Sequence, residues 1–349
     1  MYGVRVCFNF IDLHATVVLS LLLFSCELED RDAGSVAVSG ENQLYVVSWN
    51  VQTFFDAQTS GLEYAEFRGS KSIWSQQLYE HRLERLLEAI EQIDADILVL
   101  QEIENMAVMY DISNGLAGRL RGSDSYGWMC FEVEEGSSIG CGVFSRFPLG
   151  QKRVHQVDCR TNGEQPQLRP LLEVEVLLGD EENPQVMNLF ACHWKSKSGG
   201  EDEAAFWQAR QEMLLEWQLR RVLSGSTGTG ISGTSSVGAI ICGDFNRELG
   251  EFTVSGKDSG RVMLGSVEAD SGWLHENTTS EGSYWYQQQW ERIDHVFTVG
   301  NLEILHFEAL SSGPWVQLDE SGNLIPFRYA LWKDEGYSDH LPVACLISY

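Results

Sequence analysis

One apolar run constrains the fold more than any other part of the chain. Residues 239–246 have the sequence AIICGDFN, in which apolar residues lead into Gly243 and two short polar residues, Asp244 and Asn246, follow. Such a run is typical of a buried strand. Residues two apart on an extended chain point the same way, so Asp244 and Asn246 should share one side while Phe245 turns into the core. Taken alone, the run also suits a strand followed by an ordinary Asx turn.

Several other strand-like runs begin or end in a polar residue. Turn chemistry alone does not call for Glu, His and Arg at strand ends, so together these positions favour a chemical site over a series of turns. Carboxylates with an amide can hold a hard divalent ion, an Asp–His pair can orient an imidazole, and Arg offers a fork for phosphate. The residues concerned are Asn50, Glu102, Arg169, His193, Asp244, Asn246, Asp294, Asp339 and His340.

Two stretches show the periodicity of helices. Residues 79–93 place leucine and isoleucine on one face, with charged residues opposite. Residues 201–223 form a longer helical stretch, in which we expect Ala205, Met213, Leu214 and Trp217 to point inward.

Six short motifs resemble those of the endonuclease/exonuclease/phosphatase superfamily, whose members have a deoxyribonuclease I-like fold. They are SWN (48–50), LQE (100–102), CHWKSK (192–197), GDFN (243–246), RIDHVF (292–297) and SDHLPV (338–343). They follow the order of the family and extend over residues 45–347. The resemblance implies an α/β fold, a four-layer α-β-β-α sandwich of two mixed sheets, with the active site at the rim where strand ends converge.

The same resemblance implies a role for each polar strand end in metal-assisted phosphoester hydrolysis. Glu102 should be the main ligand of Mg²⁺, with Mn²⁺ or Ca²⁺ as alternative ions, and Asn50 and Asp339 should help to hold it. Asp244 should position or deprotonate the attacking water, and Asn246 should align that water with the phosphate.

The remaining positions are expected to contact the phosphate. His340, oriented by Asp294, should contact the scissile phosphate from one side, and His193 should act from the other side. Arg169 should hold a phosphate oxygen. The two lysines of the CHWKSK motif would add phosphate contacts or form an ordinary solvated turn.

The substrate is less constrained than the reaction. The HWKSK sequence, followed by an Arg-containing helix, resembles exported bacterial nucleases of the superfamily, so nucleic acid is the expected substrate. The net charge of −27 gives no general attraction for nucleic acid, and metal with a few basic residues would have to supply it locally. The alternatives are a sphingomyelinase-like or other lipid or small-molecule phosphodiesterase or phosphatase, whose aromatic-rich residues 273–290 would meet membrane, and a non-catalytic binding protein with the same fold.

Residues 1–26 resemble a signal peptide. A short apolar core at 17–24, too brief to span a bilayer, ends in LFSC, which resembles a bacterial lipobox with Cys26 as the lipidated residue. Residues 27–42 are expected to be a linker, and residues 43–349 the folded domain. We therefore expect an exported monomer, either an envelope lipoprotein held to the membrane through Cys26 or a secreted protein.

Overall fold

The computed structural model describes residues 42–120, 125–158, 167–179, 183–225, 235–255, 260–275, 278 and 280–349. The predicted signal peptide and, apart from Asn42, the predicted linker lie outside the described residues. No described helix has both the length and the apolar character needed to cross a membrane.

The first sheet contains six strands in the order β15-β18-β1-β2-β4-β3. Its central strands β1 (Gln43–Phe54) and β2 (Ile97–Ile103) run parallel, and every other pair is antiparallel. A parallel pair needs a crossover, which α1 (Gln76–Ile93) provides. The other strands are β3 (Trp128–Glu132), β4 (Gly140–Ser145), β15 (Glu303–Ala309) and β18 (Val343–Ser348).

The second sheet contains eight strands in the order β5-β6-β7-β8-β14-β11-β10-β9. Here β7 (Pro184–His193) and β8 (Ser235–Asp244) form the parallel pair, connected through α3 (Glu201–Leu223). The remaining strands are β5 (Leu149–His155), β6 (Leu171–Gly179), β9 (Thr253–Val254), β10 (Arg261–Leu264), β11 (Val267–Ser271) and β14 (Asp294–Gly300).

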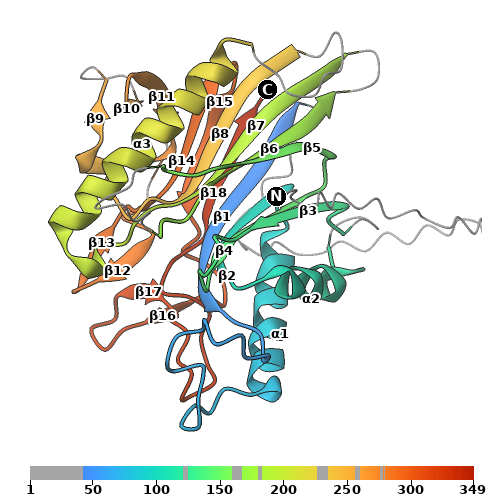
Figure 1. The fold of residues 1–349 in the computed structure, drawn as a ribbon, viewed down its shortest axis with the longest axis vertical. Coiled ribbons are helices and arrows are strands. Elements are labelled where there is room, and N and C mark those ends of the chain that lie inside the picture. The colour runs from blue at the N-terminus through green and yellow to red at the C-terminus, as the bar shows by residue number, and fades with distance from the viewer. Residues whose placement is uncertain are drawn as a thin grey trace, which may run out of the picture.

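The two sheets pack against each other, with helices on their outer faces (Figure 1). The first sheet carries α1 and α2 (Met106–Leu116), and α3 lies along the second. Because each sheet is covered on both faces, its central strands are apolar and buried along nearly their whole length. This arrangement confirms the predicted four-layer sandwich.

Two small hairpins project from the sandwich near one end of the central strands (Figure 1). One joins β12 (Tyr284–Tyr286) to β13 (Gln289–Glu291), and the other joins β16 (Val316–Leu318) to β17 (Leu324–Pro326). Three 3₁₀ turns complete the described elements: η1 (Lys197–Gly199), η2 (Leu249–Glu251) and η3 (Gly272–Leu274).

The two crossover helices differ in how well their buried faces were predicted. α1 buries the leucines and isoleucines of the expected face. The inward face predicted for α3 is wrong for three of its four residues: Ala205 is exposed, and the exposed fractions of Met213 and Trp217 are 57% and 70%. Leu214 is partly buried and packs against the core, as predicted. The face that α3 buries is instead partly polar and consists of Ala204, Trp207, Gln208, Gln211, Leu215, Gln218, Leu219 and Val222.

A buried ion network ties α3 to the edge of the second sheet. Glu173 on β6 is fully buried and accepts from Arg153 on β5 at 2.7 Å and from Arg221 on α3 at 2.5 Å. The Nε2 atom of His155 lies 2.7 Å from the same carboxylate, and Asn188 donates to it at 2.7 Å. Burial alone would raise the pKa of Glu173, but these partners outweigh burial and lower it to about 2.

We expect the substitution Glu173→Gln to destabilise the protein by about 3 kcal/mol at pH 7, because the partly buried Arg153 and Arg221 lose the charge of their shared, fully buried carboxylate. Glu268→Gln, which removes an exposed ion pair with Arg261, should destabilise the protein far less, because solvent screens that pair. Urea unfolding measures both differences. Because the folded pKa of Glu173 is lowered, its contribution is present above the unfolded pKa and should fade as the pH falls from about 4 towards 2. A cost for Glu173→Gln that stays constant from pH 7 to pH 3 would contradict this account.

Candidate active site

The candidate site lies where the C-terminal ends of the two parallel strand pairs meet. β1 and β2 bring Asn50 and Glu102 to this rim from the first sheet, and β7 and β8 bring His193 and Asp244 from the second. The sheets connect directly here, since Asn50 Nδ2 donates to Asp244 Oδ2 at 3.0 Å. We call the central group of polar side chains the rim cluster: Asn50, Glu102, His193, Asp244, Asp294 and His340.

Strand register in the second sheet aligns three members of the rim cluster. His193 on β7 lies directly opposite Asp244 on β8, and Asp244 lies directly opposite Asp294 on β14. Residues opposite each other on paired strands present their side chains to the same face. The imidazole and the two carboxylates therefore form a row on the face that meets the first sheet, and all three residues are buried.

Asn50 connects the carboxylates of the two sheets. Its Nδ2 atom donates to Glu102 Oε1 at 3.1 Å as well as to Asp244, and its Oδ1 atom accepts from the backbone N–H of Gln52 at 3.0 Å. The amide nitrogen, which cannot bind a metal, thus faces both carboxylates. The predicted role of Asn50 as a metal ligand would require its carboxamide to turn by 180°.

The backbone that follows Asn50 has an uncommon conformation. Gln52 and Thr53 have φ values of 53° and 47°, and Glu102 on the neighbouring strand has 67°, in the left-handed region that non-glycine residues rarely occupy. This turn of the chain directs the N–H of Thr53 to Glu102 Oε2 at 2.5 Å. The same segment therefore holds Asn50 and Glu102 through its backbone amides.

Arg82 on α1 holds that segment from the opposite side. Its guanidinium donates to the carbonyls of Val51 and Thr53 at 3.0 Å each, and also to the carbonyl of Gln52. It lies 3.8 Å from the centre of the Tyr329 ring, and burial lowers its pKa to about 10. The sequence analysis missed Arg82, although an arginine within the apolar periodicity of a predicted helix was an available signal.

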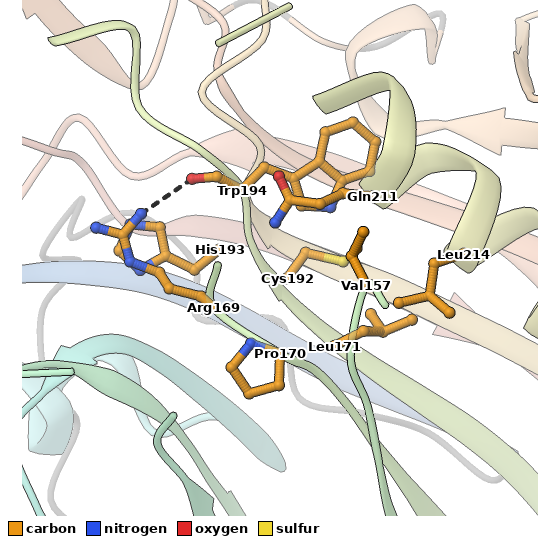
Figure 2. Close-up of a pocket in the computed structure, with 9 residues that line it drawn as sticks. All are labelled: Val157, Arg169, Pro170, Leu171, Cys192, His193, Trp194, Gln211 and Leu214. Atoms are coloured by element: carbon orange, nitrogen blue, oxygen red, sulfur yellow. Dashed lines mark hydrogen bonds between the residues drawn. The ribbon is translucent and has the colours of Figure 1, made fainter. Parts of the chain in front are cut away.

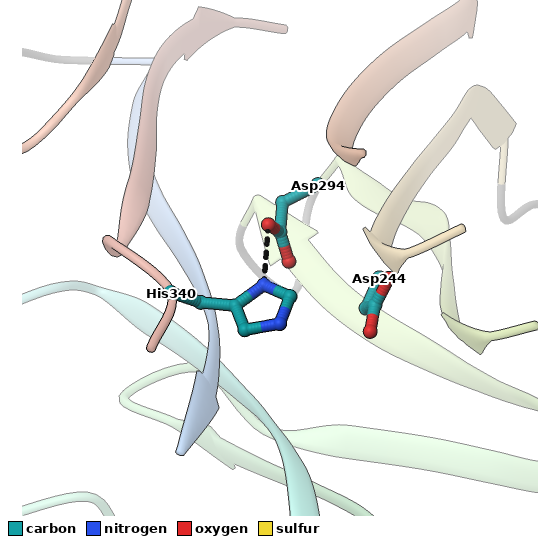
Figure 3. Close-up of side chains that lie close together, drawn as sticks. All are labelled: Asp244, Asp294 and His340. Atoms are coloured by element: carbon teal, nitrogen blue, oxygen red, sulfur yellow. Dashed lines mark hydrogen bonds and ion pairs between the residues drawn. The ribbon is translucent and has the colours of Figure 1, made fainter. Parts of the chain in front are cut away.

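Asp294 and His340 form a buried ion pair (Figure 3). Nδ1 of His340 donates to Asp294 Oδ2 at 2.8 Å, and the Ser283 hydroxyl donates to the same oxygen at 2.7 Å. Burial alone would lower the pKa of His340, but Asp294, followed by Asp244 and Asp339, outweighs burial and raises it to about 10. His340 is therefore an imidazolium at neutral pH, and it is held in place as the sequence predicted.

Asp244 has the opposite electrostatic character. Burial, reinforced by the charge of Asp294, raises the pKa of Asp244 to about 7. Its Oδ1 atom accepts from the backbone N–H of Asn246, whose φ is 48°. Nδ2 of Asn246 donates to the carbonyl of Trp194 at 3.2 Å, so this side chain belongs to the loop after β8 and lies beside the rim cluster.

His193 and Arg169 form the other side of the site. Burial, followed by the charges of Arg169 and His340, lowers the pKa of His193 well below its usual value, so the imidazole is neutral. Its Nε2 atom faces Asp244 at 3.5 Å and Glu102 at 3.8 Å, which favours the tautomer protonated at Nε2. Arg169 donates to the carbonyl of Trp194 at 3.1 Å beside a small pocket that His193 also lines (Figure 2).

Tyr64 is a further residue that the sequence analysis missed. It lies on the long loop between β1 and α1, and Arg169 and Ser138 are close enough to its hydroxyl to counter the burial that raises its pKa. It is partly exposed, and the charge of Glu102 acts on it. A tyrosine in a loop without periodicity gives no signal in the sequence, and only the fold brings it to Arg169.

Three other predicted contacts lie outside the rim cluster. The nearest basic group recorded for the Asp339 carboxylate is Arg328, with 3.8 Å between Nε and Oδ2. Lys197 forms an exposed ion pair with Glu251 at 2.7 Å, and Lys195 lies 4.0 Å from Glu203. Neither lysine contacts the rim cluster through a bond in the described part of the chain, in keeping with a solvated turn.

The donors at the rim suit a hard divalent cation. The side chain of Glu102 is 16% exposed, whereas the side chains of Asp244 and Asp294 are almost fully buried. A cation that enters from solvent therefore reaches the Glu102 carboxylate first. Asp244, Asp294 and His340 also have one possible ligand atom each within 4.8 Å of one another. Nδ1 of His340 already donates to Asp294, so the more exposed Glu102 side is more open to a cation than this triad.

The endonuclease/exonuclease/phosphatase family model matches residues 47–340, and this chain belongs to that family. The enzymes of this family hydrolyse phosphoester bonds. No curated protein matches the sequence.

Solved structures resemble this chain at low sequence identity. They include truncated Caenorhabditis elegans TDP2, with 14% identity, a TM-score of 0.52, and 88% of this chain and 98% of that chain covered. A family member from Bacteroides thetaiotaomicron has 15% identity and a TM-score of 0.50, with 87% of this chain and 97% of that chain covered. A family member from Bacteroides vulgatus has 11% identity and a TM-score of 0.50, with 88% of this chain and 98% of that chain covered. At these identities the likeness shows the fold alone.

The protonation of His340 is directly testable by NMR titration of the histidine rings in EDTA. We expect the His340 signal of the unmodified protein to remain that of an imidazolium well above pH 8. Asp294→Asn should lower its midpoint to about 6.5 or below, because burial then dominates. Asp244→Asn should lower it less, since the charge of Asp244 is the weaker cause. A midpoint near 6.5 in the unmodified protein would refute the buried ion pair.

The positioning role of Arg82 predicts a loss of metal affinity without any change of ligand. Arg82→Met should weaken Mn²⁺ binding, measured by electron paramagnetic resonance, by about 10- to 100-fold. The Mn²⁺ affinity of Arg82→Lys should lie between those of the unmodified protein and Arg82→Met, because one ammonium cannot reach three carbonyls in the same geometry. Arg85→Met is the matched control, since Arg85 lies on the same helix as Arg82 but pairs with Asp334. Equal affinities in Arg82→Met and Arg85→Met would show that Arg82 does not position the ligands.

Proposed function

We propose that this protein is a divalent-metal-dependent phosphodiesterase that hydrolyses nucleic acid, with Mg²⁺ as the favoured ion. The observation that carries the proposal is that Asp244, Asp294 and His340 converge at the buried rim, where one ligand atom of each lies within 4.8 Å of the others. Asp244 is a carboxylate whose pKa of about 7 suits a general base, and His340 is an imidazolium held by Asp294. A base beside a cation suits the attack of water on a phosphate ester.

The residues of the chain divide the reaction between them. Asp244 accepts a proton from water while the water oxygen forms a bond to phosphorus, and Asn246 helps to align that water. The bond from phosphorus to the leaving oxygen breaks on the opposite side. His340 and Arg169 meet the negative charge that develops on the phosphate oxygens, while neutral His193 donates a hydrogen bond through Nε2.

Glu102 is the residue proposed to hold the divalent cation, with Asp339 as a further ligand and Asn50 as another once its carboxamide turns to present Oδ1 to the ion. When bound, the cation would act as a Lewis acid that neutralises charge on the phosphate. The backbone N–H of Thr53 and the amide of Asn50 fix the orientation of the Glu102 carboxylate before any ligand binds. Such preorganisation lowers the cost of assembling the site.

The proposal of a nucleic-acid substrate rests on the HWKSK sequence and on the surroundings of the aromatic residues. A lipid phosphodiesterase would use residues 273–290 to meet membrane. However, Trp273 is buried, and Trp285 packs edge-to-face against Trp290, which contacts the core. Most of the large apolar rings of this segment therefore stabilise the fold.

We further propose that the protein is exported and acts as a monomer, with Cys26 as a lipid attachment site. The support is the lipobox-like sequence before Cys26 and the polar stretch after it. Expression of the full chain in a bacterium, with and without Cys26→Ser, tests the anchor. The unmodified chain should partition with membranes and incorporate radiolabelled palmitate, and the variant should do neither. Light scattering of protein starting at Gln43 tests the monomer.

The activity is tested with protein starting at Gln43 and a substrate panel of DNA, RNA, sphingomyelin and sugar phosphates, each with Mg²⁺, Mn²⁺ or Ca²⁺. We expect release of short oligonucleotides in Mg²⁺ and none in EDTA. Glu102→Ala should lower kcat by at least about a hundredfold and leave the unfolding transition intact, because its side chain lies at the rim. Equal turnover in EDTA and Mg²⁺ would refute the metal role. Release of phosphocholine without cleavage of DNA or RNA would favour the lipid alternative.

A further inference from the structure

The hairpin β12–β13 is fixed directly to the Asp294–His340 pair. Tyr284 forms a backbone bridge with His340, and the N–H of Leu341 donates to the carbonyl of Ser283 at 2.7 Å. The Ser283 hydroxyl donates to Asp294 at 2.7 Å. These bonds attach the first strand of the hairpin to both members of the ion pair, so its side chains have a defined position beside the site.

Alternation along this strand separates its aromatic rings into two groups. Trp285 points to one side and packs against Trp290, with ring centres 5.2 Å apart. Tyr284 and Tyr286 point to the other side, with ring planes only 15° apart and centres 6.1 Å apart. We call this pair the tyrosine wall. It is held flat by a two-residue turn in which Gln287 and Gln288 both have positive φ, as in a tight hairpin.

The tyrosine wall leads from the imidazole to solvent. The ring of Tyr284 lies 4.6 Å from the ring of His340 and is tilted by 34°, while Tyr286 has 50% of its surface exposed. Tyr284 is partly buried. Among the described residues, the outer ring has no recorded hydrogen bond and no aromatic neighbour except Tyr284. The exposed ring of Tyr286 is therefore separated from His340, the residue proposed to contact phosphate, only by the ring of Tyr284.

We propose that the tyrosine wall is a stacking subsite for a nucleobase attached next to the scissile phosphate, an inference that rests on the proposed function. An aromatic side chain can stack on any of the nucleobases, and this stacking needs no positive charge on the protein. That property matters in a chain of net charge −27, for which electrostatic attraction for a polyanion is weak. A sugar phosphate has no aromatic face, so the wall also distinguishes nucleotide substrates from phosphosugars.

Turnover of matched dinucleotides tests the subsite. Thymidylyl-thymidine is compared with two analogues in which either the 5′ or the 3′ base is absent and a tetrahydrofuran ring replaces the nucleoside sugar. Tyr286→Ala should raise the KM for the complete dinucleotide about tenfold and change kcat less than twofold. One of the two analogues should have a high KM in the unmodified protein that Tyr286→Ala does not raise further. Tyr286→Phe should behave as the unmodified protein.

Trp217→Ala is the matched control, because Trp217 is another exposed aromatic residue and lies on α3 away from the hairpin. It should leave every KM unchanged. The subsite is wrong if Tyr286→Ala raises the KM of both analogues as much as that of the complete dinucleotide, or if Tyr286→Phe matches Tyr286→Ala. It is also wrong if Tyr286→Ala impairs only the cleavage of sphingomyelin vesicles, which would place lipid at the wall.

A binding measurement without turnover separates the subsite from the proposed function. A dinucleotide with one 2-aminopurine base is titrated with protein in EDTA, and stacking is detected as loss of its fluorescence. The fluorescence should be quenched by the unmodified protein and by Tyr286→Phe, and Tyr286→Ala should bind about tenfold more weakly. Quenching without any cleavage in Mg²⁺ would refute the proposed function and leave the subsite standing. Cleavage without quenching that depends on Tyr286 would refute the subsite alone.

Discussion

The bonds from Arg82 to three successive carbonyls are the interaction on which the rim depends most. The segment after Asn50 can present its N–H groups to Asn50 and Glu102 only if its carbonyls point the other way, into the protein. Carbonyls without partners there would cost free energy, and the guanidinium satisfies all three. The partners of this buried cation are carbonyl oxygens and the rings of Phe54 and Tyr329. Arg82 thus stabilises the strained backbone of residues 51–53 through its carbonyls, and the backbone N–H groups remain available to Asn50 and Glu102.

The second crossover helix provides the same kind of support to the second sheet. Nε2 of Gln208 on α3 donates to the carbonyl of Lys195 at 2.8 Å and to the carbonyl of Asn246 at 2.9 Å. The side chain of Gln211 accepts from the N–H of Lys195. Each parallel strand pair therefore has a crossover helix whose buried polar residue holds the loops that follow the strands. Precision at the rim comes from these helices as well as from the strands themselves.

This role of the crossover helices explains which predictions from sequence held. Strand ends were predictable because a run of β-branched residues followed by Asp, Glu or His has a simple period, and register then brings His193, Asp244 and Asp294 together. The inward face of α3 was predicted wrongly because apolarity was taken as the sign of burial. The helix buries Gln208 and Gln211 for the loops and leaves Met213 and Trp217 exposed.

Residues that act across the fold gave no usable pattern in the sequence. Arg82 contacts a segment about thirty residues earlier in the chain, and Tyr64 meets Arg169 across the rim. Such pairings depend on how the two sheets pack, which periodicity does not encode. Motif resemblance supplied the roles of single residues but not the orientation of the Asn50 carboxamide, because that orientation is set by the N–H of Gln52 and by the two neighbouring carboxylates.

The electrostatics of the rim also give a physical reason for the proposed metal requirement. A phosphate approaching the site meets the imidazolium of His340 and the guanidinium of Arg169, but it also meets the carboxylates of Glu102 and, once deprotonated, Asp244. Like charges a few ångströms apart in a poorly solvated site repel strongly. In the proposed mechanism Asp244 must be ionised to act as the base, so protonating it cannot remove the repulsion. A divalent cation at Glu102 would make the net charge on that side of the site positive. The ionised base and the phosphate could then lie close together.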